Sequence, residues 1–242
     1  MVSKRLNRLA MMVTEGNRLA DVGTDHGYVP ILLFRQKRIP SAIAMDVNPG
    51  PLLRAEQHIQ EYGVQNYIET RLSDGLAALA SGEADTVLIA GMGGALTVRI
   101  LTEGQKVLDS VRELVLQPQS EIGDVRKWLA AHGYRIICED IVLDEGKYYP
   151  MMKAIHGEDT VYSDEEYQFG RLRLQHSLDT LMDYLKRNLT VQRQIQQELP
   201  LKEEPRIQKR RLETEQEIKR LEKVLEACEK LYAEKDRKEE KV

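Results

Sequence analysis

The stretch "DVGTDHGY", residues 21–28, lies between a short apolar segment and a segment with helical spacing. Gly23 and Gly27 are typical of the loop that joins the first strand of a nucleotide-binding α/β domain to its first helix, where the backbone approaches a ligand closely. Asp25 stands where such loops usually carry another glycine. The stretch predicts a ligand site at the end of a strand, for a ligand that can lie next to carboxylates.

The two carboxylates of this loop, Asp21 and Asp25, argue against a pyrophosphate. A helix N-terminus carries partial positive charge that suits an anion, but two unit charges about 4 Å apart interact by about 1 kcal/mol even in water. S-adenosylmethionine has no phosphate and carries an ammonium and a sulfonium group. Such a cationic cofactor fits the glycines and the carboxylates together.

The first part of the chain alternates apolar runs with helical patterns. The runs are "RLADVG", "SAIAMDV", "ADTVLIAG", "RELVLQP" and "RIICEDIVL". Between them, "PLLRAEQHIQEYG" and "EIGDVRKWLAAHGY" have helical spacing and carry a glycine at the end of the pattern, as helices often do. This alternation predicts a parallel sheet with helices on both faces. After Tyr134 two runs follow without a helix, which predicts a hairpin at the sheet edge with "DEGKYYP" as its turn.

Further features stand at the ends of the later strands. Asp46 lies 25 residues after Asp21, where an acidic residue accepts hydrogen bonds from the ribose of an adenosine. Asp74 ends the third strand, where a carboxylate can accept a hydrogen bond from the adenine amino group. "AGMGG", residues 90–94, follows the fourth strand at the same edge of the sheet. Four such features in order predict a Rossmann-like class I methyltransferase domain.

Composition changes near residue 158, because fifteen of the sixteen glycines precede it. Beyond it, apolar residues recur at spacings of three and four, and "ELPLKEEP" carries two prolines that a continuous helix does not accept. We expect an α/β domain over residues 1–158 and an antiparallel coiled-coil hairpin over residues 159–242, closing on itself within a monomer. Its expected apolar positions are Leu178, Leu181, Leu185, Ile195, Leu199, Ile218, Leu221, Leu225, Cys228 and Tyr232.

Charge and cysteine content limit the function classes. The net charge of −4 means that any nucleic-acid contact must come from a local basic surface. Two distant cysteines, Cys138 and Cys228, fit neither a disulfide framework nor a metal site and indicate the reducing cytoplasm. No apolar run reaches the length of a membrane span, and the N-terminal segment has no signal-peptide core.

The motifs "LADVGTDHGYVPI", "AMDVNPGPL", "SDGL" and "IAGMGG", followed by "LVLQPQSEIGDVRKWL" and a coiled-coil tail, closely resemble the bacterial TrmK family. Members of that family are tRNA (adenine-N1)-methyltransferases that modify adenine 22. The resemblance covers essentially the whole chain and implies S-adenosylmethionine as cofactor and tRNA as partner. The expected cofactor-binding residues are Asp21, Gly23, Thr24, Gly27, Asp46, Val47, Asn48, Asp74, Gly75, Ala90, Gly91, Met92 and Gly93.

Methylation of adenine N1 leaves positive charge on the ring, which a nearby carboxylate would stabilise. Asp25 is expected to do so, with His26 and Tyr28 beside it as further catalytic residues. A tRNA base inside folded structure must be extruded before its Watson–Crick edge is reached, and an aromatic ring can then hold it by stacking. Tyr148 and Tyr149 are the other aromatic candidates for RNA binding.

Basic residues predict where tRNA phosphates lie. Lys4, Arg5 and Arg8 belong to a short N-terminal helix that is expected to contact phosphates and to make binding salt-dependent. Residues 36–38 and 208–211 are further candidates.

Several alternatives stay open at this point. Asp21 and Asp25 could merely cap the following helix, and His58 could have a surface or core role. The chain could be a non-catalytic RNA-binding protein that keeps the cofactor pocket, an NAD-dependent oxidoreductase, or a methyltransferase for DNA, rRNA or protein.

Overall fold

The computed structural model describes residues 3–200 and 204–239. The chain forms two compact units, Met1–Tyr162 and Ser163–Val242.

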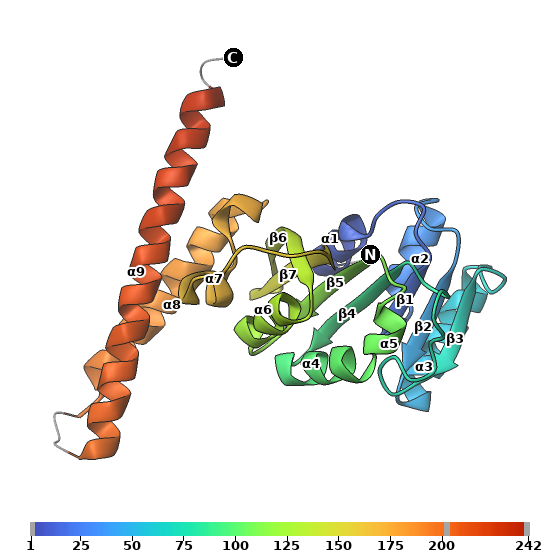
Figure 1. The fold of residues 1–242 in the computed structure, drawn as a ribbon, viewed down its shortest axis with the longest axis horizontal. Coiled ribbons are helices and arrows are strands. Elements are labelled where there is room, and N and C mark those ends of the chain that lie inside the picture. The colour runs from blue at the N-terminus through green and yellow to red at the C-terminus, as the bar shows by residue number, and fades with distance from the viewer. Residues whose placement is uncertain (1–2, 201–203, 240–242) are drawn as a thin grey trace. The chain divides into compact units, whose positions relative to one another are not determined.

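The first unit is built on a seven-stranded sheet with the order β3-β2-β1-β4-β5-β7-β6 (Figure 1). Its parallel strands are β1 (Leu19–Val22), β2 (Ala42–Asp46), β3 (Ile68–Leu72), β4 (Thr86–Met92) and β5 (Glu113–Pro118). The strand order reverses between β1 and β4, and open α/β sheets bind ligands at the carboxyl ends of the strands at such a point.

The edge of the sheet is the predicted hairpin. β6 (Tyr134–Asp144) pairs antiparallel with β7 (Lys147–His156), and β7 pairs antiparallel with β5. The prediction of a "DEGKYYP" turn is wrong in extent, because Glu145 (φ 47°) and Gly146 (φ 77°) alone form the turn. Two residues with positive φ close a two-residue hairpin, so pairing resumes at once at Lys147.

Six helices of the first unit cover the two faces of the sheet. Those that precede the reversal of strand order are α1 (Lys4–Met12), α2 (Tyr28–Arg35) and α3 (Pro49–Glu61). Those that follow it are α4 (Gly94–Glu103), α5 (Gln105–Leu108) and α6 (Ile122–Ala131). Because β-α-β crossovers are right-handed, reversing the strand order places the second set on the opposite face.

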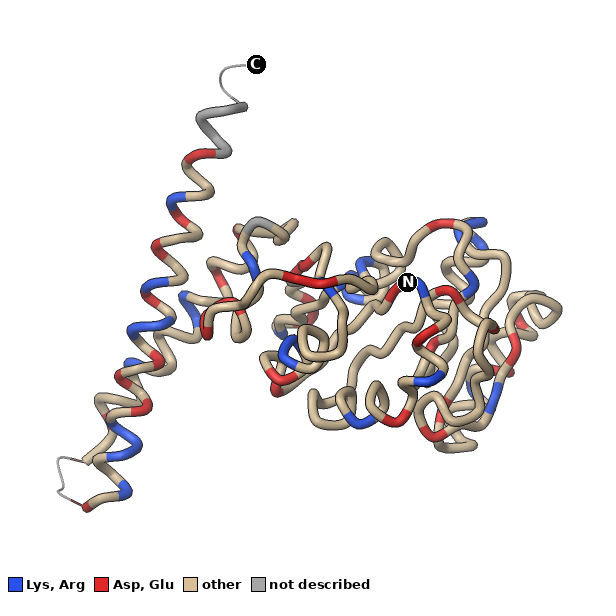
Figure 2. The backbone as a smooth tube through the Cα atoms, in the orientation of Figure 1, with Lys and Arg blue, Asp and Glu red and all other residues tan. Residues whose placement is uncertain are grey.

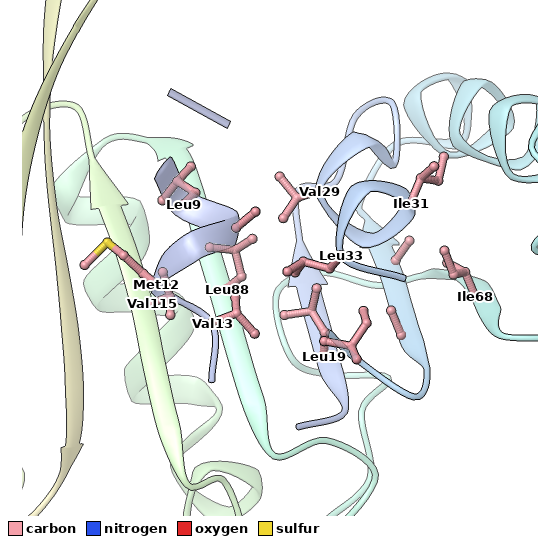
Figure 3. Packing of buried hydrophobic residues seen from close by; sticks show 14 of the residues in the cluster. Leu9, Met12, Val13, Leu19, Val29, Ile31, Leu33, Ile68, Leu88 and Val115 are labelled. Atoms are coloured by element: carbon pink, nitrogen blue, oxygen red, sulfur yellow. The ribbon is translucent and has the colours of Figure 1, made fainter. Parts of the chain in front are cut away.

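The core beneath α1 and α2 fixes the N-terminal helix to the sheet. Leu9 of α1 and Leu33 of α2 lie over Leu88 of β4, and all three are fully buried (Figure 3). Val115 of β5 extends this cluster. The apolar face of α1 therefore holds its first turn beside the carboxyl ends of the strands.

The second unit is helical, with α7 (Asp164–Phe169), a 3-10 turn (Leu172–Leu174), α8 (Leu178–Glu198) and α9 (Pro205–Glu239). α7 is a helix that the sequence analysis did not predict. Ser163 and Glu166 form a capping box at its start, a signature that is visible in the sequence.

α8 and α9 pack together as a hairpin, and Arg193 pairs with Glu222 across it at 2.8 Å. The buried seam of α9 contains Leu221, Val224 and Cys228. The prediction of Tyr232 as a seam position is wrong, because it is exposed, and three further predicted positions, Ile195, Leu199 and Leu225, are only half-buried. Leu225 and Tyr232 each lie one residue beyond the position that the three-then-four spacing of the buried seam requires.

Among the described residues, no helix is both long and apolar enough to cross a membrane.

Candidate functional site

The loop of residues 21–28 turns sharply between β1 and α2. Gly23, Asp25 and Gly27 all have positive φ, at 75°, 48° and 69°. Aspartate tolerates this left-handed conformation better than most residues, which explains how Asp25 stands in a glycine position. The N-cap of α2 is Gly27, and Asp21 lies within β1. The alternative that either aspartate caps the helix is therefore wrong.

Asp21 is a buried carboxylate at the end of β1. Burial raises its pKa to about 6, the Thr24 hydroxyl opposes this rise through a 2.6 Å hydrogen bond, and the charge of Asp46 adds to it. No cation among the described residues pairs with Asp21. A ligand with positive charge would favour its ionised form.

Asp25 extends to the exposed side of the loop. Its Oδ1 accepts a hydrogen bond from Nη2 of Arg54 at 2.6 Å, and its Oδ2 lies 3.4 Å from Nε2 of His26. Arg54 belongs to α3, so this ion pair joins the loop to the next helix. The pair fixes where the Asp25 carboxylate lies without burying it.

Three rings lie together beside Asp25. Tyr28 stacks on His26 and on His58, with centroid distances of 5.2 and 5.0 Å. The His58 Nδ1 lies 2.9 Å from the carbonyl oxygen of His26 and must donate to it. The expectation that His58 has only a surface or core role did not foresee this contact. Arg54 and His58 are four residues apart on α3, a spacing that presents both to the loop.

The ends of β2 and β3 carry the other two carboxylates. Asp46 accepts a hydrogen bond from the backbone N–H of Asn48 at 2.9 Å. Asp74 lies two residues beyond β3 rather than at its end, and it pairs with Arg99 of α4 at 2.9 Å. Both carboxylates line the same hollow with Gly23.

The "AGMGG" segment is partly strand, because β4 runs through Met92. The prediction that the segment follows the strand is wrong in this respect. Gly91 (φ 81°) makes a bulge that shifts the register between β4 and β5, and bulges of this kind re-aim side chains next to active sites. Met92 packs on Gly23, where an added Cβ would lie 2.2 Å from its Cε.

Two hollows meet at the carboxyl ends of β1 and β4 and share Gly23 and Ala90. The first, of about 210 Å³, we call the acceptor hollow; its polar lining residues are Arg5, Asp21, Thr24, Asp25, His26 and Tyr28. The second, of about 240 Å³, we call the cofactor hollow; among its lining residues are Asp46, Val47, Asn48, Asp74, Gly75, Gly91, Met92 and Arg99. Two predicted cofactor residues line neither hollow, since Gly27 packs against Ala55 and Gly93 caps α4.

The three basic residues of α1 have three different environments. Lys4 is exposed. Arg5 lines the acceptor hollow, where its Nη1 donates to Oε1 of Gln117 at 2.8 Å. Arg8 forms an ion pair with the buried Asp140 and thereby ties α1 to β6.

Some residues of the two other candidate basic stretches, 36–38 and 208–211, contact other parts of the protein. Arg38 donates to the carbonyl oxygens of Ala10, Met11 and Val13, at 3.1, 3.4 and 2.7 Å, and so caps the end of α1. Charges of both signs alternate along α9 (Figure 2), and both Lys209 and Arg210 pair with Glu213. Arg38 is thus engaged in the fold, and Lys209 and Arg210 lie among charges of both signs.

Tyr148 and Tyr149 are neighbours on β7, so their side chains point to opposite faces of the sheet. Tyr149 packs against the core cluster under α1, and the guanidinium carbon of Arg5 lies 5.2 Å from its ring centroid. Only Tyr149 therefore lies on the side of Arg5.

The site has no metal cluster: no group of three or more His, Cys, Asp or Glu side chains in the described part of the chain could hold a metal ion.

Comparison with known proteins identifies the family. Residues 2–152 match the model of a methyltransferase domain. The chain is 36% identical to the tRNA (adenine(22)-N(1))-methyltransferase of Bacillus subtilis, over 71% of this chain and 72% of the relative. The chain belongs to the tRNA (adenine(22)-N(1))-methyltransferase family.

Solved structures agree with this family over most of the chain. The B. subtilis m1A22 tRNA methyltransferase TrmK superposes with a TM-score of 0.83 at 28% identity, covering 93% of this chain and 99% of the other. A candidate tRNA (m1A22) methyltransferase of Streptococcus pneumoniae, solved in complex with S-adenosyl-L-methionine, superposes with a TM-score of 0.82 at 32% identity, covering 93% of this chain and all of the other. The predicted TrmK resemblance and the Rossmann-like fold class are thereby confirmed.

Proposed function

We propose that this protein is an S-adenosylmethionine-dependent methyltransferase that methylates N1 of adenine 22 in tRNA. The observation that carries the proposal is the junction of the two hollows at Gly23 and Ala90, because methyl transfer needs two ligands that meet end to end. Membership of the tRNA (adenine(22)-N(1))-methyltransferase family supports the substrate.

The residues of the cofactor hollow fit S-adenosylmethionine. Asp46 would accept hydrogen bonds from the ribose hydroxyls. Asp74 would accept a hydrogen bond from the adenine amino group, either beside its ion pair with Arg99 or in place of it. Asp21 lines the acceptor hollow, which joins the cofactor hollow at Gly23. Buried without a cation, it would face the positively charged methionine end of the cofactor at this junction. When bound, this cofactor supplies an electrophilic methyl group.

Asp25 would act on the adenine of the tRNA. Its carboxylate accepts hydrogen bonds, so it would hold the exocyclic amino group and stabilise the positive charge that develops on the ring. Arg54, at 2.6 Å from Asp25, holds the carboxylate in place. A guanine would present its carbonyl oxygen to the same carboxylate, and this repulsion favours adenine.

His26 and Tyr28 would form the wall against which the extruded base stacks, because their rings already lie parallel to within 15°. Arg8 pairs with Asp140, and Tyr148 points to the face of the sheet opposite Tyr149, so we propose neither as an RNA contact. Lys4 is exposed, and we keep it as a candidate phosphate contact.

We further propose that the protein acts as a monomer in the cytoplasm. The pairing of α8 with α9 within one chain supports the monomer. Cys138 and Cys228 are both free thiols, as expected in a reducing compartment.

The first experiment compares two tRNA transcripts that differ only in carrying adenine or guanine at position 22. Labelled S-adenosylmethionine should yield N1-methyladenosine only in the transcript with adenine 22. Label at another position or in neither transcript would refute the proposed substrate.

Asp25→Asn tests the catalytic assignment. We expect turnover to fall by about 100-fold or more. Binding of S-adenosylhomocysteine, measured by calorimetry, should stay within about twofold of the wild type, since Asp25, unlike the buried Asp21, is exposed, pairs with Arg54 and does not line the cofactor hollow. Near-normal turnover would remove Asp25 from the chemistry.

A further inference from the structure

Arg5 is a guanidinium fixed inside the acceptor hollow. Its backbone N–H donates to Oδ2 of Asp144 at 3.0 Å, its Nη1 donates to Oε1 of Gln117 at 2.8 Å, and its guanidinium carbon lies 5.2 Å from the centroid of the Tyr149 ring. These contacts come from β5 and from the β6–β7 hairpin. Asp144 of β6 thus holds the backbone of α1 at Arg5, while Gln117 of β5 and Tyr149 of β7 orient its side chain.

The guanidinium of Arg5 has no carboxylate of the described residues within ion-pair distance, although Asp21 and Asp25 line the same hollow. Arg54 pairs with Asp25, and Arg99 pairs with Asp74, but the side-chain partner of Arg5 is the neutral amide of Gln117. Among the described residues, Arg5 has no carboxylate in an ion pair with its side chain. Most of the five N–H donors of its guanidinium therefore stay available to a ligand.

Arg5 also lies against the segment where the two hollows meet. A Cβ added to Gly91 would lie 3.3 Å from its Nη1, so the absence of a side chain at Gly91 lets the guanidinium approach the β4 bulge. A ligand of Arg5 is thus held next to the site of methyl transfer rather than on the outer surface.

We propose that Arg5 binds a backbone phosphate adjoining the target adenosine and positions that nucleotide for methylation. This inference rests on the proposed function. A guanidinium matches a phosphate bidentately and with opposite charge. Against the adenine ring itself, it would repel the positive charge that N1 methylation creates, so the ring is the less favourable partner.

Arg5 is on this view a positioning residue, and the other basic residues of α1 differ from it. Asp140 neutralises the charge of Arg8. Lys4 is exposed, and its ammonium group cannot bind a phosphate bidentately as a guanidinium does. We therefore expect one specific phosphate contact from this helix, together with a diffuse contribution from Lys4.

The test pairs protein variants with a modified tRNA. A neutral methylphosphonate replaces the phosphate on either side of adenosine 22, and single-turnover methylation is measured with wild-type protein, Arg5→Ala, Arg5→Lys and, as the matched control, Lys4→Ala. With wild-type protein, one of the two linkages should lower the rate by about 100-fold. Arg5→Ala should lower the rate on unmodified tRNA by a similar factor, and the same linkage should then cause no further loss.

The controls separate positioning from general electrostatics. The effects of Lys4→Ala and of the methylphosphonate should multiply, and Arg5→Lys should restore only part of the rate. Arg5→Ala should also reduce the slope of log affinity against log salt by about 0.7–0.9, the value for one phosphate contact. Retained calorimetric binding of S-adenosylhomocysteine would show that Arg5→Ala is folded.

Three results would overturn the inference. The methylphosphonates could leave the wild-type rate unchanged at both linkages, a result that depends on no variant. The rate losses caused by Arg5→Ala and by the sensitive methylphosphonate could multiply, which would mean that Arg5 and that phosphate act independently. A 7-deazaadenosine at position 22, which lacks the N7 acceptor, could lower the wild-type rate but have no further effect in Arg5→Ala. That result would mean that the guanidinium contacts the base rather than a phosphate. Failure of the wild type to methylate unmodified tRNA would refute the proposed function itself.

Discussion

Lowering the pH should weaken cofactor binding through Asp21. Burial raises the pKa of this carboxyl from its usual 3.8 to about 6. One pH unit is worth about 1.4 kcal/mol, so keeping Asp21 ionised in the cofactor-free protein at neutral pH costs about 3 kcal/mol. A cationic ligand beside Asp21 returns part or all of that free energy, because it stabilises the ionised form.

The size of the effect follows from linkage. If the bound cofactor restores the pKa of Asp21 to about 3.9, affinity at pH 5 should be about tenfold lower than at pH 7. Binding at pH 5 should also release about 0.8 protons. The amino group of S-adenosylmethionine does not interfere below pH 7, since α-amino groups titrate near 7.7–8.0.

The assay is isothermal titration calorimetry of S-adenosylmethionine binding between pH 5 and 7, in buffers with different ionisation enthalpies. Asp21→Asn should bind more weakly and lose the pH dependence. His26→Asn is the control for a change at another polar side chain of the acceptor hollow, and it should keep the pH dependence. An affinity that does not change between pH 5 and 7, or a dependence that survives in Asp21→Asn, would refute the reasoning.

The same carboxylate should make the cofactor-free protein less stable at neutral pH. Its folded pKa lies above the unfolded value of about 3.9, so its contribution is fully present below that pH and is lost as the pH rises through about 6. Asp21→Asn should therefore raise the free energy of unfolding at pH 7 by about 1–3 kcal/mol, measured by urea denaturation without cofactor. A variant less stable than the wild type at pH 7 would contradict this.

Three further predictions concern other contacts. Arg126→Met should lower the free energy of unfolding by about 3–5 kcal/mol, because it removes the 2.8 Å ion pair of the buried Glu139. The double variant Arg126→Met/Glu139→Leu should recover much of this loss in urea titrations. An equal loss in the double variant would contradict this prediction. Gly23→Ala should weaken calorimetric binding of S-adenosylhomocysteine, because it strains the backbone at a φ of 75° and makes the end of the Met92 side chain, which lines the cofactor hollow, move away from the new Cβ; unchanged affinity would contradict this. Glu113→Gln should flatten the acid side of the stability curve. Although burial opposes it, hydrogen bonds hold the pKa of Glu113 below its usual value, so its stabilisation is present above about pH 4.3 in the wild type and is lost as the pH falls further. Thermal unfolding at pH 3–7 measures this, and equal slopes in both proteins would refute it.

Much of the fold could be predicted from local patterns. The alternation of apolar runs with amphipathic segments predicted the parallel sheet, because the central strands β1, β4 and β5 are buried on both faces over most of their length and the helices on one. The hairpin of β6 and β7 followed from the missing helix between two apolar runs. The extent of its turn did not, since the two-residue closure depends on the backbone angles of Glu145 and Gly146.

The candidate site divides in the same way. Its carboxylates could be predicted because parallel strands bring their carboxyl ends to one edge, whatever the distance along the chain. Sequence order therefore placed Asp21, Asp46 and Asp74 in one region. The spacing also singled out Asp25 as a residue in a glycine position, and its φ of 48° accounts for that.

Only the tertiary structure assigned partners to the charges. In the sequence, Lys4, Arg5 and Arg8 are simply three basic residues of one helix. In the structure, Lys4 is exposed, Arg5 lies in the acceptor hollow and Arg8 pairs with the buried carboxylate of Asp140. The physical reason is that a helix residue's environment depends on which way it faces and on what lies opposite. For α1, the opposing residues Gln117 and Asp140 come from strands more than a hundred residues away.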